Sequence, residues 1–208
     1  MPRSGGIVLF CALDRTGRIR LLGRDEDRYG VLSLTRLDSF IRRLIAQRAC
    51  LDAAVELVAG RPGSVLELGL GNGRSYDHLR ARLPERRIVV VERDPRPHPA
   101  CMPCPQDLVI GTFETVLPRA AALLPHDLVL VHADIGTGDP VRNACLAREV
   151  ARHLAGFLPQ DCIIVGDQHL PARRLLPLPL PEGVEPGRYY LYRVTSADVD
   201  HIMLEPEG

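Results

Sequence analysis

The sequence contains no lysine, and all 26 of its basic residues are arginines. A P-loop needs a lysine beside the nucleotide phosphates and a Schiff-base enzyme needs a lysine amine, so both classes are excluded. The 26 acidic residues balance the arginines, which leaves a formal net charge of zero. A neutral chain gives no strong signal for binding nucleic acid or an anionic membrane surface.

Long apolar runs are missing as well, since no stretch approaches the roughly 20 residues of a membrane-spanning helix. The run at 7–13 follows Arg3, as in a signal peptide, but Asp14 comes directly after it and no small-residue cleavage site is present. We therefore expect no membrane partner and a cytoplasmic location. The six cysteines fit that expectation, because most lie in apolar segments where a reduced thiol packs as a small hydrophobe.

A second pair of metal-ligand residues is also absent from the proline-rich stretch at 93–106. His98, Cys101 and Cys104 stand close together there, but no further Cys/His pair follows at the spacing of a zinc site. We expect an irregular surface loop without a metal, and zinc or redox use is the minor alternative. The prolines also block a regular helix in this stretch.

The chain is organised around residues 64–76. The apolar run 65–68 predicts a buried strand of a parallel sheet, and the apolar spacing at 76–83 predicts a helix. Between them, three glycines stand at alternate positions: Gly69, Gly71 and Gly73. Glycine allows positive φ and close approach of a ligand to the backbone. In an open parallel sheet, such a turn lies at the carboxyl edge, where ligands bind.

The dinucleotide fingerprint G-x-G-x-x-G is not present in either register of these glycines. The place of the third glycine holds Arg74 in one register and Asp77 in the other. Glu67 precedes the turn, and its charge would oppose a pyrophosphate at the helix N-terminus. A sulfonium ligand with an amino group tolerates a carboxylate there. A plain glycine turn without a ligand is the alternative.

The pattern Glu67-x-Gly69-x-Gly71-x-Gly73 resembles the first motif of class I S-adenosylmethionine-dependent methyltransferases. The resemblance covers residues 36–195. Within it, segments 70–79 and 132–136 are similar to a family of small bacterial methyltransferases whose substrates are mostly unassigned. The resemblance implies S-adenosyl-L-methionine as the cofactor and a three-layer α/β/α fold whose last strand is antiparallel.

Elsewhere in the chain, short apolar segments alternate with segments of helix length. Further strands are expected at 88–92, 108–110, 127–132, 162–165 and 189–194. Helices are expected over 35–60, from Pro118 at a first helical position, and from Asp139-Pro140 as cap and first residue. This alternation predicts a doubly wound, Rossmann-like α/β fold with a mostly parallel sheet.

Residues 1–35 have no counterpart in the methyltransferase pattern. Segments 7–13 and 18–22, joined by a turn at 14–17, predict a hairpin, and the charged stretch 24–35 is typical of a linker. We expect an N-terminal extension at 1–35 and an S-adenosylmethionine-binding domain at 36–208. The proline-rich stretch 171–186 is expected at a sheet edge or on the surface.

The resemblance also implies which residues hold the cofactor. Glu92 ends the second strand 21 positions after Gly71, where a carboxylate accepts hydrogen bonds from ribose hydroxyls, a device that NAD enzymes share. Thr112 and Phe113 follow the third strand and would flank the adenine, with core packing as the alternative for Phe113. The expected cofactor-binding residues are Glu67, Gly69, Gly71, Asn72, Gly73, Tyr76, Glu92, Thr112, Phe113 and Asp134.

Three polar residues on carboxyl-edge loops are the catalytic candidates: Asp134, Asp167 and His169. Methyl transfer is an in-line displacement, so a base is needed only where the acceptor loses a proton. Asp134 has turn formation as its alternative role. With Asp167 and Gln168 it also resembles the metal ligands of catechol-type O-methyltransferases, but Gln168 replaces an asparagine, and we expect no metal.

The sequence identifies no acceptor and no oligomeric state. A small-molecule acceptor is expected, and a homo-oligomer stays open. The Asn-Pro-Pro-Tyr type of signature is absent, which disfavours adenine or glutamine acceptors. The alternatives are an aminopropyltransferase, in which Asp134 and Asp139 would hold a polyamine, a non-catalytic S-adenosylmethionine-binding module and, last, a nicotinamide enzyme.

Overall fold

The computed structural model describes residues 10–13, 19–22 and 35–196, and the chain divides into two units, 1–42 and 43–208. In the first unit, β1 (Phe10–Leu13) and β2 (Ile19–Leu22) pair antiparallel. These are the strands of the hairpin expected from the sequence. The predicted turn at 14–17, the linker up to residue 34 and the tail from 197 lie outside the described residues.

Helix α1 (Arg36–Leu57) begins at a capping box, as the sequence predicts. The Thr35 N–H donates to Oδ2 of Asp38 at 3.0 Å, and the Asp38 N–H donates to Oγ1 of Thr35 at 3.0 Å. These two bonds satisfy backbone donors that a helix start leaves without partners. The boundary between the two units falls within this helix.

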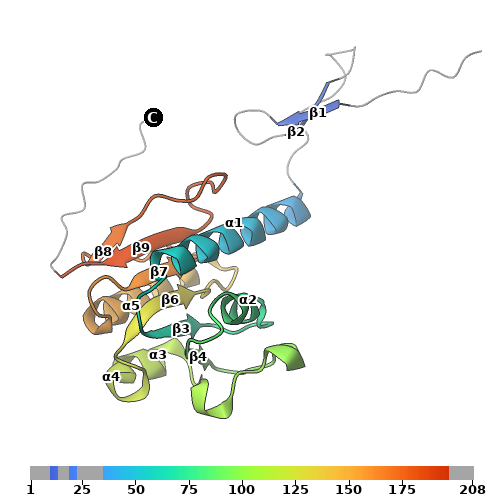
Figure 1. Ribbon diagram of the computed structural model, residues 1–208. Helices are drawn as coiled ribbons and strands as arrows, with labels where there is room; N and C mark the ends of the chain where they lie inside the picture. The colour runs from blue at the N-terminus through green and yellow to red at the C-terminus, as the bar shows by residue number, and fades with distance from the viewer. Residues whose placement is uncertain (1–9, 14–18, 23–34, 197–208) are drawn as a thin grey trace, which may run out of the picture. The chain divides into compact units, whose positions relative to one another are not determined.

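The second unit contains a seven-stranded sheet in the order β5-β4-β3-β6-β7-β9-β8 (Figure 1). Its strands are β3 (Ser64–Leu68), β4 (Ile88–Glu92), β5 (Leu108–Ile110), β6 (Leu128–Ala133), β7 (Ile163–Gly166), β8 (Leu175–Pro177) and β9 (Tyr190–Val194). The strands from β3 to β7 are parallel, and β9 runs antiparallel to both of its neighbours. The expected doubly wound, mostly parallel sheet is therefore confirmed.

Within residues 35–196, four further helices and three short 3₁₀ turns connect the strands. They are α2 (Arg74–Arg82), α3 (Phe113–Val116), α4 (Ala120–Leu123), α5 (Pro140–Phe157), η1 (Pro99–Cys101), η2 (Pro105–Asp107) and η3 (Leu117–Arg119). The proline-rich stretch 93–106 holds only η1 and η2, because each proline removes a backbone donor. Among the described residues, no helix combines the length and the apolar character needed to cross a membrane.

Two of the helix starts predicted from the sequence have different outcomes. Asp139 caps α5 as expected, since its Oδ1 accepts from the N–H groups of Val141 at 2.9 Å and Arg142 at 3.2 Å. The expected helix start at Pro118 is wrong, because that segment is already helical from Phe113. Pro118 lies in η3, where its missing N–H interrupts the helix and separates α3 from α4.

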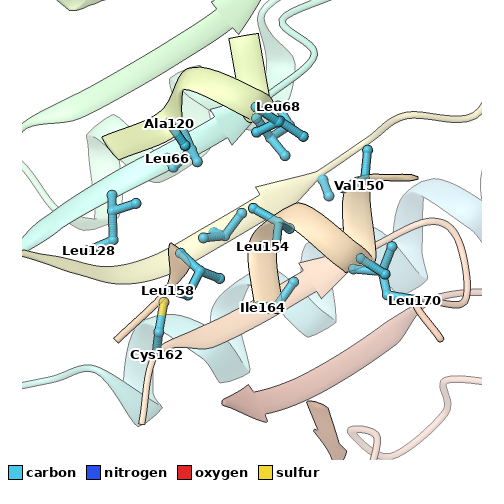
Figure 2. Close-up of a cluster of buried hydrophobic side chains, with 14 of the residues drawn as sticks. Leu66, Leu68, Ala120, Leu128, Val150, Leu154, Leu158, Cys162, Ile164 and Leu170 are labelled. Atoms are coloured by element: carbon cyan, nitrogen blue, oxygen red, sulfur yellow. The ribbon is translucent and has the colours of Figure 1, made fainter. Parts of the chain in front are cut away.

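Alternating side chains of β3 pack against different helices, which gives the expected three layers. Leu66 and Leu68 belong to a core cluster with α5 and the segment from α3 to α4, and Figure 2 shows Leu154 and Val150 of α5 within it. Val65 belongs to a second cluster with α1 and α2. A strand buried on both faces in this way is typical of a parallel sheet covered by helices.

The order of the strands places a crevice beside β3. From β3 the chain proceeds outward to β4 and β5, and it then returns to β6 on the other side of β3 and continues to β7. The connections leave the carboxyl ends of β3 and β6 in opposite directions, and ligands of open α/β sheets bind at such a point. A Cβ on Gly69 would lie 2.5 Å from the carbonyl oxygen of Asp134, so only glycine allows this approach.

The packing of α5 leads to a stability prediction. Leu154 is fully buried against the sheet, so Leu154→Ala should lower the free energy of unfolding by about 2–5 kcal/mol in urea titrations. Leu176→Ala on β8 is the control, because that side chain is 41% exposed. Equal losses in the two variants would contradict the placement of α5 on the core.

Candidate functional site

A pocket of about 590 Å³ opens at the carboxyl edge of the sheet, between the ends of β3 and β6. Its walls come from α1, the glycine turn with the start of α2, the end of β4, the segment after β5, the loop after β6 and the start of α5. This volume is in the range of sites for small molecules and cofactors. The strand order and the pocket therefore indicate the same place for a ligand.

The carboxylate of Glu92 fastens the glycine turn to the tip of β4. Its Oε2 accepts hydrogen bonds from the N–H groups of Leu70 at 2.9 Å and Gly71 at 3.3 Å. Its Oε1 accepts from the N–H groups of Arg93 at 2.8 Å and Asp94 at 3.2 Å. Gly71 has a φ of 49°, and a Cβ there would meet nothing within 4 Å. The turn therefore presents bare backbone to open space.

Asp134 follows β6 and brings a carboxylate to the opposite side of the pocket. Its Oδ1 lies 3.3 Å from Nη1 of Arg43, and its Oδ2 accepts from Nε2 of Gln47 at 3.1 Å. The side chain is 27% exposed, so it has access to a ligand. Both of its partners come from α1, which the sequence separates widely from this loop.

Asp167 shapes the loop that carries Asp134. Its Oδ1 accepts from the Ile135 N–H at 2.9 Å, and its Oδ2 accepts from the Gly136 N–H at 3.0 Å and from Nε2 of Gln168 at 3.0 Å. A Cβ on Gly136 would lie 2.3 Å from that Oδ2, so a larger residue there would displace the Asp167 carboxylate. Burial and the nearby charge of Asp134 raise the pKa of Asp167.

A set of buried polar side chains lies beneath the pocket. Oε1 of Glu67 accepts from the hydroxyl of Ser75 at 2.5 Å, and its Oε2 lies 3.0 Å from Nδ1 of His132. Nε2 of His132 is 2.6 Å from the hydroxyl of Tyr189, and Nε2 of Gln47 donates to that hydroxyl at 2.9 Å. Inside the core, these bonds connect β3, β6, α1 and α2 with Tyr189, which lies directly before β9.

The charges in this set shift the pKa values of its members. Burial is the largest single influence on the pKa of His132 and lowers it. The charge and hydrogen bond of Glu67, together with the charges of Asp134 and Asp167, outweigh burial, so the pKa stands above its ordinary value. Burial, followed by the charges of Asp134 and Asp167, raises the pKa of Tyr189 well above its ordinary value. The Tyr189 hydroxyl is therefore protonated at neutral pH.

Comparison with known proteins decides the family. A family model described as S-adenosyl-L-methionine methyltransferase matches residues 34–194. The chain belongs to this family. An S-adenosyl-L-methionine methyl transferase of Silicibacter pomeroyi DSS-3 is 38% identical to it, with a TM-score of 0.73 over 78% of this chain and 99% of that chain. The expected class I methyltransferase fold and S-adenosyl-L-methionine as cofactor are thus confirmed.

Two more distant structures are also described as methyltransferases. The TDP-rhamnose 3'-O-methyltransferase CalS11 of calicheamicin biosynthesis is 21% identical, with a TM-score of 0.49 over 77% of this chain and 81% of that chain. An O-methyltransferase family protein from Burkholderia thailandensis is 14% identical, with a TM-score of 0.42 over 80% of this chain and 65% of that chain. No protein with a curated description matches.

Most of the expected cofactor-binding residues of the methyltransferase line its pocket: Gly69, Gly71, Asn72, Glu92, Thr112, Phe113 and Asp134. Glu67, Gly73 and Tyr76 do not. Glu67 is fully buried, with both oxygens bonded inside the core, and a Cβ on Gly73 would meet Cβ of Cys101 at 2.5 Å. Tyr76 is 8% exposed and packs in the core. Their part in binding the cofactor stays a prediction.

Of the three catalytic candidates, the structure brings only Asp134 to the pocket. Asp167 holds the loop from behind, and the ring of His169 lies 5.8 Å from that of Tyr190, centroid to centroid. Within the described part of the chain, no group of three or more potential ligand side chains could hold a metal ion.

Four residues of the methyltransferase site or its support were not singled out as site residues from the sequence: Arg43, Gln47, His132 and Tyr189. One signal was available, because His132 is a polar residue in the otherwise apolar run of β6, and fully buried polar residues are uncommon. Gln47 is likewise polar on the apolar side of α1. Arg43 and Tyr189 carry no such signal.

The glycine turn leads to a binding prediction. Gly71→Val should abolish measurable binding of S-adenosyl-L-methionine in calorimetry, because the side chain would occupy the open space above the turn. The fold should persist, since no atom lies within 4 Å of the new Cβ. Gly183→Val has the same backbone strain at a φ of 80° without neighbours, and it should bind normally. Normal binding by Gly71→Val would exclude the turn as the cofactor site.

The Glu67–His132 pair leads to a prediction about pH. The pKa of His132 is higher in the folded chain than its ordinary 6.5, so its contribution to stability is complete below pH 6.5 and is lost as the pH rises through the folded pKa. The double variant Glu67→Gln/His132→Gln keeps hydrogen-bonding groups without charge. Relative to that variant, the wild type should lose free energy of unfolding in urea titrations as the pH rises above 6.5 and through the folded pKa of His132.

The control for this experiment is His98→Gln, which changes an exposed histidine on a surface turn. Its stability should follow that of the wild type over the same pH range. A constant difference between the wild type and the double variant at every pH would refute the role given to the buried pair.

Proposed function

We propose that the pocket holds S-adenosyl-L-methionine along the glycine turn and a small-molecule acceptor beside Asp134. The observation that supports this most is the position of one pocket across the ends of β3 and β6. It contains the bare backbone at Gly71 on one side and the carboxylate of Asp134 on the other. A donor and an acceptor can therefore lie side by side in one cavity.

Each side of the pocket has its own part in this proposal. Glu92 holds the turn through the N–H groups of Leu70 and Gly71, and its carboxylate also accepts hydrogen bonds from the ribose hydroxyls of the cofactor. Thr112 and Phe113 flank the adenine. The cofactor supplies a methyl group that is already activated by the positive charge on sulfur.

On the acceptor side, Asp134 is the group in position to orient an acceptor or to take its proton. The carboxylate is held by Arg43 and Gln47, so it faces the ligand in a fixed geometry. Alignment of the acceptor atom with the methyl group contributes most of the rate in such a displacement. Asp167 contributes indirectly, through the loop that it holds.

The wider setting is part of the same proposal. Residues 36–208 form the methyl-transfer domain of a cytoplasmic bacterial enzyme, and residues 1–35 are an extension to it. The family match over 34–194 supports the boundary. The five cysteines within residues 35–196 are all free, which suits a reducing compartment.

Calorimetry with three ligands separates the alternatives. The chain should bind S-adenosyl-L-methionine and S-adenosylhomocysteine and should not bind NADH. Turnover of decarboxylated donor with putrescine would indicate an aminopropyltransferase. A non-catalytic module would bind the donor but would form no S-adenosylhomocysteine with any acceptor in a panel of phenols, carboxylates and amines.

Glu92→Gln tests the cofactor side directly. The amide leaves N–H groups of the turn without an acceptor and binds the ribose more weakly, so the affinity for both S-adenosyl-L-methionine and S-adenosylhomocysteine should fall about tenfold, or about 1.4 kcal/mol. Glu114→Gln is the matched control, because Glu114 also lines the pocket and is exposed. Wild-type affinity in Glu92→Gln would remove Glu92 from the site.

A further inference from the structure

Four polar side chains form an unbroken hydrogen-bonded chain beneath the pocket: Glu67, His132, Tyr189 and Gln47. The first three are fully buried, and Gln47 is 7% exposed. Polar groups in an apolar core cost free energy unless they are hydrogen-bonded, and each member of this set has at least two partners. We define these four residues as the buried relay.

The buried relay ends at the carboxylate of Asp134. Nε2 of Gln47 donates one N–H to the hydroxyl of Tyr189 at 2.9 Å and the other to Oδ2 of Asp134 at 3.1 Å. The amide therefore cannot turn away from Asp134 without losing its bond to Tyr189. The second partner of Asp134, Arg43, is 35% exposed at a longer distance of 3.3 Å, so it restrains the carboxylate less.

We propose that Tyr189 and Gln47 are positioning residues that hold the carboxylate of Asp134 toward the sulfonium centre of the bound donor. The Glu67–His132 pair fixes Tyr189, Tyr189 fixes Gln47, and Gln47 fixes Asp134. This inference rests on the proposed function, which places the donor in the pocket beside Asp134. A carboxylate must be held within about 0.5 Å to act at a reacting centre, and groups behind it provide that support.

Stability alone does not account for the buried relay. A buried ion pair is often no more stabilising than apolar side chains of the same volume. Tyr192 shows what a structural tyrosine does in this sheet, because its buried hydroxyl accepts only from the backbone N–H of Leu170 at 3.2 Å among its hydrogen bonds in the described residues. The hydroxyl of Tyr189 instead contacts two side chains that lead to the pocket.

Two ligands measure the position of the carboxylate without a known acceptor. S-Adenosyl-L-methionine carries a positive sulfonium and S-adenosylhomocysteine does not, so a correctly held Asp134 favours the first ligand. We divide the affinity for S-adenosyl-L-methionine by the affinity for S-adenosylhomocysteine. Asp134→Asn should lower this ratio about three- to tenfold. Tyr189→Phe should lower the ratio in the same direction by about threefold, with the affinity for S-adenosylhomocysteine nearly unchanged.

Tyr192→Phe is the matched control, because it removes another buried tyrosine hydroxyl only three residues further along the chain, within β9. It should lower the melting temperature and leave the ratio of affinities unchanged. In the Asp134→Asn background, Tyr189→Phe should cause no further fall, since the two act through one carboxylate. Where Tyr189→Phe does not fold, Gln47→Met tests the same bond to Asp134.

The outcomes separate this inference from the proposed function. A wild-type chain that binds neither ligand refutes the proposed function and the inference with it. If the wild type binds both ligands and Tyr189→Phe has the same ratio of affinities as Tyr192→Phe, the inference is refuted and the proposed function is not. An additive fall in the double variant also refutes it, because the effect of Tyr189 would then not pass through Asp134.

Discussion

The buried pair of Glu67 and His132 joins the two strands that diverge at the pocket. The residues are direct partners in the register of β3 and β6, and neither has any exposed surface. A one-residue slip of the register would leave both charges unpaired in the core, at a cost of about 3–5 kcal/mol. The pair therefore sets the register, and the register places Gly69 beside the backbone of Asp134.

This constraint explains how one pocket keeps two parts with different roles. The glycine turn is held by Glu92 from the neighbouring strand β4, and the loop after β6 is held by Asp167, which directly follows β7. Each ligand-facing segment thus receives its support from the adjacent strand of the sheet. Loops positioned by a rigid scaffold in this way are the usual place of binding residues.

The sequence predicted what depends on local pattern and missed what depends on distant contacts. Periodicity revealed the strands, and their alternation with segments of helix length predicted the fold. The cofactor was implied by the resemblance of the glycine turn to the methyltransferase motif. The helix start predicted at Pro118 is wrong, because a proline that begins a helix and a proline that interrupts one cannot be distinguished from the sequence alone. The bonds from Gln47 to Asp134 and Tyr189 connect residues 87 and 142 positions apart, which no local pattern encodes.

The carboxylate of Asp134 places a negative charge at one end of the pocket. Burial is the first cause of the raised pKa values of Asp167 and Tyr189, and the charge of Asp134 raises both further. A nearby carboxylate raises the pKa of an acid because it disfavours a second negative charge. Four arginines also line the pocket, so the negative charge is local to Asp134. At that end of the pocket it attracts a sulfonium cation and opposes a pyrophosphate, the group whose binding fingerprint the glycine turn lacks.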